Sequence, residues 1–121
     1  MLFTKMHGAG NDFVVIDARS GDQNWGNLAR SICDRHFGVG GDGIILICSS
    51  NIGDLRMRMF NPDGSEAEMS GNGIRLFAKF VIDRNITEKI CLKFSFIWFS
   101  PIFQKLMIKI HFLLNKRNTT V

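Results

Sequence analysis

The segment that decides the fold is NPDGSEAEMSGNGIR, at residues 61–75. A helical pattern begins at the end of this segment and continues beyond it. Apolar side chains recur there every three or four positions, at Ile74, Phe77, Ala78, Val81 and Ile82. Polar residues fall on the opposite side, which predicts an amphipathic helix from Ile74. Residues 70–73 then lie at the helix N-terminus, where unpaired N–H groups and the helix dipole favour an anion. Glycines on both sides of Asn72 let a ligand approach the backbone. The segment is typical of a carboxylate-binding site.

A purely structural interpretation of the same residues stays open. Serine and asparagine are favoured at helix N-termini, so Ser70 can act as an N-cap, with Asn72 and its flanking glycines forming a turn. In that case the segment would begin a helix and bind nothing.

Two further blocks occur upstream, FTKMHGAGNDF at residues 3–13 and DRHFGVGGDG at residues 34–43. Together with residues 61–75, in this order and spacing, they resemble the diaminopimelate epimerases. The resemblance runs from residue 1 to about residue 88 and then fades. The family has two similar lobes with the active site between them, so residues 1–88 are expected to form the N-terminal lobe alone.

The resemblance implies a set of site residues. The family interconverts LL- and meso-diaminopimelate with two cysteines, one from each lobe, and needs neither pyridoxal phosphate nor a metal. The first of these cysteines corresponds to Ser70, and the second has no counterpart, since Cys91 follows no Cys-Gly motif. Substrate-binding positions of the family correspond to Asn11, Asn61, Gly71 and Asn72. For Asn11 the alternative is a turn residue in the left-handed conformation.

The order of expected elements gives the fold class. Strands are expected at residues 2–6, 13–17, 43–48 and 55–59, and helices from Trp25, after the N-cap Asn24, and from Ile74. Gly38 is expected to end the first helix, and residues 61–68 to form a loop. The elements follow one another in the order strand, strand, helix, strand, strand, helix. This order indicates an α+β lobe in which a mixed sheet is packed around a helix.

Charge and composition change along the chain. Residues 1–88 hold nine Lys or Arg against eleven Asp or Glu, whereas residues 89–121 hold six Lys or Arg and no acid. The net charge of +4 therefore belongs to the tail, and nucleic-acid binding by the lobe is not expected. The uncharged stretch at residues 94–104 is too short to span a bilayer. Residues 108–112 alternate like a strand, and the tail as a whole indicates a shifted reading frame or a divergent end.

The cysteines and the glycine-rich block exclude other classes. Cys33, Cys48 and Cys91 are odd in number and contain no Cys-x-x-Cys pair, so neither disulfides nor a zinc site is expected, and Cys33 and Cys48 are assigned to the core. Because no signal peptide is recognisable, a cytoplasmic setting follows. Residues 38–43 satisfy G-x-G-x-x-G but follow a helix and precede a strand, the reverse of the dinucleotide-binding context.

Three functions remain. The leading hypothesis is an amino-acid epimerase acting on diaminopimelate, impaired because serine is a far weaker acid than cysteine. The second is a non-catalytic lobe that binds a carboxylate, or docks with a second lobe or a second copy. The third is a dehydratase of the same fold, since Ser70 replaces a cysteine.

Overall fold

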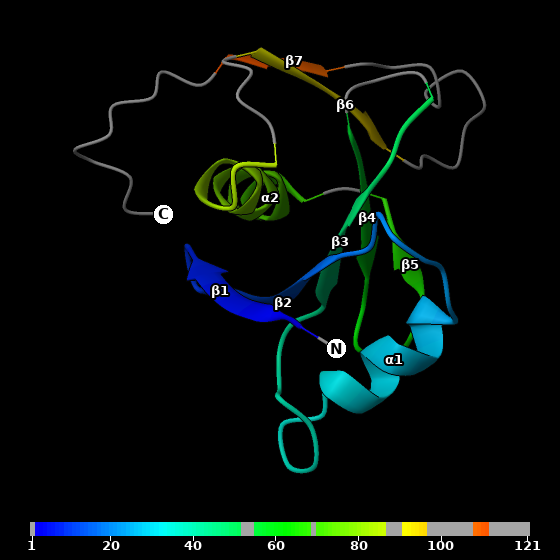
Figure 1. Ribbon diagram of the computed structural model, residues 1–121. Coiled ribbons are helices and arrows are strands. Elements are labelled where there is room, and N and C mark those ends of the chain that lie inside the picture. The colour runs from blue at the N-terminus through cyan, green and yellow to red at the C-terminus, as the bar shows by residue number, and fades with distance from the viewer. Residues whose placement is uncertain (1, 52–54, 69, 87–90, 97–107, 112–121) are drawn as a thin grey trace.

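The computed structural model describes residues 2–51, 55–68, 70–86, 91–96 and 108–111 (Figure 1). The helices are α1 (Trp25–Ile32) and α2 (Gly71–Asp83). The strands are β1 (Thr4–Gly8), β2 (Asn11–Asp17), β3 (Ile44–Cys48), β4 (Leu55–Phe60), β5 (Glu66–Ala67), β6 (Cys91–Phe96) and β7 (Ile108–His111). They form one sheet in the order β1-β2-β3-β4-β6-β7, with β5 paired to β4. The pairs β2–β3 and β4–β6 are parallel and the others antiparallel, so the expected mixed sheet of an α+β lobe is confirmed.

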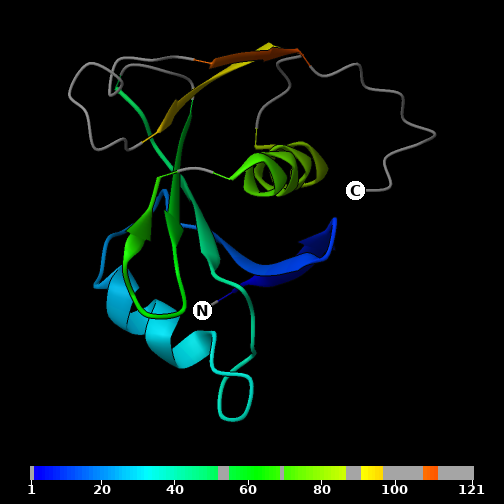
Figure 2. The same ribbon diagram turned by 180° about the vertical axis from the view of Figure 1, so that it is seen from behind.

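The two helices cover opposite faces of this sheet (Figures 1 and 2). One core lies between α2 and alternate residues of the strands, among them Phe13, Val15 and Ile45. The other lies between α1 and the intervening residues, among them Val14 and Ile44. A strand buried on both faces reads as a continuous apolar run, which explains the sequence of β3 and confirms the strand expected at residues 43–48.

Strand β4 has one apolar and one cationic face, as the sequence predicts. Met57 and Met59 are buried under α2, whereas Arg56 and Arg58 are half-buried on the other face. The guanidinium of Arg58 pairs with Glu66, with 2.8 Å between Nε and Oε1, and the pairing ties β4 to β5.

The first hairpin differs from the sequence prediction. The strands run from Thr4 to Gly8 and from Asn11 to Asp17, because the turn between them consists of Ala9 and Gly10 alone, with φ angles of 50° and 87°. Two consecutive residues with positive φ form the tight turn that matches the twist of a hairpin. Asn11 therefore lies in β2, paired with Gly8, and its interpretation as a left-handed turn residue is wrong.

The helix boundaries also differ. Helix α1 ends at Ile32 with Cys33 as its C-cap, so Gly38 does not end it. The chain after α1 instead turns back, and a Cβ at Gly38 would lie 2.3 Å from the Ser31 carbonyl oxygen. Helix α2 begins at Gly71, three residues before the expected start, and β5 lies within the expected loop at 61–68.

Two strands lie in the C-terminal segment. Strand β7 confirms the alternation at residues 108–111, and residue 112 lies outside the described residues. Strand β6, for which no strand is predicted, pairs with β4. The division of the chain at residue 88 stays a prediction. Within the described residues, no helix is both long and apolar enough to cross a bilayer.

Candidate active site

Ser70 is the N-cap of α2. It has extended backbone angles, and its Oγ accepts a hydrogen bond of 3.1 Å from the Gly73 N–H, while its carbonyl accepts one of 3.0 Å from Ile74. These are the two bonds by which an N-cap satisfies the first turn. The capping interpretation is therefore correct for Ser70, and the Gly73 N–H is not available to a ligand.

The N–H groups of Gly71 and Asn72 differ from that of Gly73. Neither donates a hydrogen bond to any of the described residues. Gly71 is exposed, with no heavy atom within 4 Å of the position of a Cβ, and the first turn holds no acidic side chain. The positive end of α2 thus presents two unpaired donors to open space, which is the arrangement that binds an anion.

The start of α2 is held rigidly from behind. Gly73 is buried against β4, where a Cβ would lie 3.0 Å from both the Met57 Cε and the Met59 Sδ. Leu76 and Phe77 follow in the same core and are fully buried. A side chain at Gly73 would need these two methionine side chains to shift by a few tenths of an ångström, so glycine lets the first turn of α2 lie close to β4.

Asn61 lies directly after β4 and closes a turn of five residues. Its N–H donates to the Ser65 carbonyl at 2.8 Å, and its carbonyl accepts from the Gly64 N–H at 2.9 Å. Its side-chain Nδ2 donates to the Ser65 Oγ at 3.0 Å. The turn therefore fixes the amide of Asn61 while its Oδ1 accepts no hydrogen bond from the described residues.

Asn11 is the first residue of β2 and is half-buried. Its side-chain amide makes no hydrogen bond with the described residues. The register places Val14 beside Ile44 and Ile44 beside Phe60, so the start of β2 and the end of β4 lie at the same end of the sheet. Asn11 and Asn61 are therefore near this end.

The predicted site residues come from three parts of the fold, the start of β2, the turn after β4 and the start of α2. Ser70, Gly71 and Asn72 share the first turn of α2, beside the middle of β4, whereas Asn11 and Asn61 lie toward the sheet end. Within the part of the chain that the structure describes, no hydrogen bond joins the two groups. Their assignment to one site stays a prediction.

A cluster of charges that the sequence reasoning missed lies next to Asn11. Arg35 donates to both carboxylate oxygens of Asp12 and also to Asp42. This guanidinium is the main reason why the pKa of the Asp12 carboxyl lies far below its usual range. Residue 12 lies in β2 and residue 35 in the irregular segment between α1 and β3, so no spacing rule links them.

The two described thiols are unsuited to catalysis. Burial raises the pKa of Cys33, which is in the core as expected, and also that of the half-buried Cys48. A thiol that stays protonated is a poor base or nucleophile. Among the described residues, no three His, Cys, Asp or Glu side chains are grouped to hold a metal ion.

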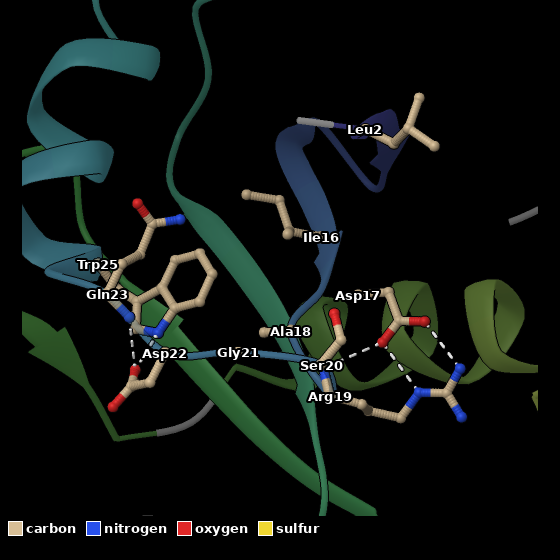
Figure 3. Close-up of a pocket in the computed structure, with 10 residues that line it drawn as sticks. All are labelled: Leu2, Ile16, Asp17, Ala18, Arg19, Ser20, Gly21, Asp22, Gln23 and Trp25. Atoms are coloured by element: carbon tan, nitrogen blue, oxygen red, sulfur yellow. Dashed lines mark hydrogen bonds and ion pairs between the residues drawn. The ribbon is translucent and has the colours of Figure 1, made fainter.

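One cavity in the described part of the chain lies away from all five predicted site residues. It measures about 690 Å³ and surrounds residues 16–23, after β2 (Figure 3). Trp25 and Asp22 line one side, with the indole N–H donating to Asp22 at 2.7 Å, and the Asp17–Arg19 ion pair lines another. The indole N–H of Trp25 and the Asp17–Arg19 ion pair thus already have partners within the cavity wall.

Comparison with known proteins identifies the family. The diaminopimelate epimerase family model matches residues 3–95. A diaminopimelate epimerase of Caldanaerobacter subterraneus subsp. tengcongensis is 56% identical over 89 residues, which cover 74% of this chain and 32% of the relative. One of Methanococcus maripaludis is 54% identical over 90 residues, with the same coverage. This chain thus spans about a third of the relatives' length.

The fold is shared more widely. A Bacillus anthracis protein of the PhzF phenazine-biosynthesis family superposes with a TM-score of 0.57 at 23% identity, over 78% of this chain and 31% of that one. A PhzF-family protein of Enterococcus faecalis has a TM-score of 0.56 at 15% identity, over 71% of this chain and 30% of that one. Identity at this level shows the fold alone, whereas the family model and the relatives of more than half identity establish that this chain belongs to the diaminopimelate epimerase family.

Proposed function

We propose that this chain is the first lobe of a cofactor-independent diaminopimelate epimerase, and that the start of α2 binds an α-carboxylate of the substrate. The observation that carries the proposal is the pair of unpaired N–H groups at Gly71 and Asn72, at an open helix N-terminus. The relatives' names supply the substrate, and Asn11 and Asn61 would contact the rest of it. The second half of the active site would come from a second lobe or a second copy.

The chemistry required is proton exchange at the α-carbon. A base removes the proton from one face, the electron pair delocalises into the carboxylate, and an acid returns a proton to the opposite face. Donors at the carboxylate stabilise the negative charge that develops there. Gly71 and Asn72 would supply these donors, and Ser70, at the same helix end, is suitably located to exchange the proton.

Serine limits this chemistry. The Ser70 Oγ accepts from the Gly73 N–H, and no carboxylate or imidazole among the described residues hydrogen-bonds to it. A hydroxyl without an adjacent base does not become an alkoxide near neutral pH. Ser70 would therefore donate a proton slowly and scarcely act as a base. This feature also favours the second candidate function, a lobe that binds the substrate carboxylate without epimerising it.

Hydrogen–deuterium exchange at the substrate α-carbon tests the proposal. LL-diaminopimelate is incubated in heavy water with the chain and with a Ser70→Cys variant, and deuterium at the α-carbon is measured by NMR. We expect slow or no exchange with serine and clear exchange with cysteine, because a helix N-terminus lowers a thiol pKa. Exchange without inversion would assign the missing step to the second lobe.

A matched control separates the site from thiol chemistry in general. Ser31→Cys places a thiol on an exposed position in the last turn of α1, where the helix dipole disfavours a thiolate. It should give no exchange. The proposed function would be overturned if Ser70→Cys also gave none, and if diaminopimelate left the Gly71 and Asn72 amide resonances unchanged.

A further inference from the structure

A network of four charged side chains surrounds the start of β2. The Arg35 guanidinium donates to Asp12 through Nη1 at 3.0 Å and Nη2 at 2.8 Å, and Nη2 also lies 3.1 Å from the Asp42 Oδ1. The Lys5 Nζ lies 3.2 Å from the Asp12 Oδ2. Planar guanidinium binds both oxygens of a carboxylate at once, so Arg35 fixes the orientation of Asp12 as well as its position.

The backbone of Asp12 is held from the same side. Its N–H donates to the Asp42 Oδ2 at 3.0 Å, and its carbonyl accepts from the Asp42 N–H at 2.7 Å. The Asp12 N–H belongs to the peptide group that links Asp12 to Asn11. The charged network therefore fixes the peptide plane on the C-terminal side of Asn11.

The glycine-rich residues 38–43 make this arrangement possible. Gly40 has a φ of 80°, and a Cβ there would lie 3.2 Å from the Arg35 Cα and Cγ. The Gly40 N–H donates to the Ile32 carbonyl at 2.9 Å, which joins the segment to the end of α1. The glycines thus let the chain wrap closely around Arg35, and this accounts for a motif that otherwise resembles a dinucleotide site.

The network is too exposed to contribute much to global stability. The side chains of Arg35, Asp12 and Asp42 are 54%, 23% and 41% exposed. Ion pairs at such positions are screened by water and contribute little to the free energy of unfolding. Their geometric effect is local, because four hydrogen bonds and one ion pair converge on one residue beside Asn11.

We propose that Arg35 is a positioning residue for Asn11: through Asp12 and Asp42 it holds the Asn11 backbone so that the side-chain amide is oriented for the substrate. This inference rests on the proposed role of Asn11 in binding diaminopimelate. Arg35 itself is not expected to touch the substrate. Its effect should be specific to Asn11 and should spare Gly71 and Asn72, which belong to a different element.

The test is an NMR titration of the isotope-labelled chain with meso-diaminopimelate. In Arg35→Gln we expect the dissociation constant to rise about tenfold or more, because small misplacements of a binding group are costly. The ligand-induced shift at the Asn11 side chain should be lost, while the shifts at Gly71 and Asn72 remain. Arg35→Lys should resemble Arg35→Gln, since a single ammonium cannot replace the planar fork.

The chain offers a matched control at the other end of β2. Arg19 pairs with Asp17 through both carboxylate oxygens, at 2.9 and 2.8 Å, and is similarly exposed. Arg19→Gln should leave the Asn11 shift and the dissociation constant unchanged. Urea unfolding midpoints of Arg19→Gln and Arg35→Gln should agree, which excludes general unfolding as the cause.

The two proposals can fail separately. If the unaltered chain does not bind diaminopimelate, the proposed function fails. The positioning role of Arg35 is then tested by hydrogen exchange of the Asp12 amide. We expect that exchange to become at least about tenfold faster in Arg35→Gln, since the anchor of Asp42 is lost. An unchanged rate, or an unchanged Asn11 shift in a chain that binds, would overturn the positioning role.

Discussion

Helix α1 and helix α2 each begin with a short polar side chain that accepts a hydrogen bond from the third residue of the helix. Asn24 accepts from the Asn27 N–H at 3.0 Å, and Ser70 accepts from the Gly73 N–H at 3.1 Å. The surroundings of these two caps are nevertheless opposite. At α1 a Cβ on Gly26 would lie 2.7 Å from the Gly64 carbonyl oxygen, whereas at α2 a Cβ on Gly71 would meet nothing within 4 Å.

The difference teaches what a cap sequence can and cannot indicate. At α1 the chain supplies its own anion, since Asp22 lies just before the helix and accepts from the Gln23 N–H and the Trp25 indole. Helix α2 has no such carboxylate before it, whereas the first two N–H groups of each helix alike donate to none of the described residues. A cap satisfies one donor in both helices, so what distinguishes the start of α2 is the open space beside Gly71, where that of α1 is closed by the Gly64 carbonyl.

The largest effect on stability is expected for a substitution in the core that packs against α2. Leu76 is fully buried one turn after the cap, and its replacement by alanine should lower the free energy of unfolding by about 2–5 kcal/mol, through lost burial and a residual cavity. Arg75→Ala, on the exposed face, should change it by less than about 0.5 kcal/mol. Urea unfolding measures both. Equal effects would mean that α2 is not held by the core behind it.

The next prediction compares the two glycines. Gly26→Ala should destabilise the chain by about 1–3 kcal/mol, because its methyl group overlaps the turn that closes at Gly64. Gly71→Ala meets no atom and should leave stability almost unchanged. Its methyl group would nevertheless obstruct a carboxylate, so diaminopimelate binding should weaken in a calorimetric titration. Tighter or equal binding would contradict an open anion site at α2.

Removing the caps should have smaller and more equal effects on stability. Asn24→Ala and Ser70→Ala each lose one side-chain bond to the third N–H of a helix, which costs about 0.5–2 kcal/mol. Thermal or urea unfolding should therefore give similar losses. Asn24→Ala added to Ser70→Cys should leave the α-deuterium exchange of diaminopimelate unchanged, and a loss of exchange there would remove the distinction between the two helix starts.

The sequence predicts what depends on local pattern. The alternation in β4, the apolar run of β3 and both caps follow from side-chain periodicity and cap preference, and the structure has them. The hairpin boundaries do not follow, because the Ala9–Gly10 turn contains an alanine with positive φ that no preference favours. Likewise, the sequence predicts that Gly38 ends a helix, whereas in the structure glycine is needed there because the chain packs closely against the Ser31 carbonyl.

The site is less accessible to such reasoning. Family resemblance indicates Ser70, Asn11 and Asn61, but sequence cannot show that the Gly73 N–H is already used or that Asn61 is bound to Ser65. These facts depend on how a residue's neighbours are bonded. The contact of Arg35 with Asp12 depends on the path of the chain after α1, and no periodicity encodes that path.

The smallest expected effect is that of acid on the two sides of the sheet, and it tests the comparison of α1 with α2 in a different way. The α1 side of the sheet relies on carboxylates: Arg35 holds the pKa of Asp12 below its usual range, and backbone N–H groups of Phe37 and His36 lower that of Asp34. A depressed pKa in the folded state gives stability that is present above the unfolded value, near about 4, and is lost as pH falls below it.

Acid should therefore loosen the segment after α1 before it affects α2, whose first turn depends on a serine and on buried apolar side chains. Amide exchange at pH 3 and pH 6, corrected for intrinsic rates, measures this. We expect the Asp12 amide to lose part of its protection between pH 6 and pH 3, because the folded-state pKa of Asp12 lies below this range, while Leu76 and Phe77 keep theirs. In Arg35→Gln the amide protection of Asp12 should differ less between pH 3 and pH 6, because the pKa of its carboxyl is then lowered less. An equal loss of amide protection in both regions would mean that α2 depends on carboxylates as much as the segment after α1 does. That result would contradict the contrast between the two regions.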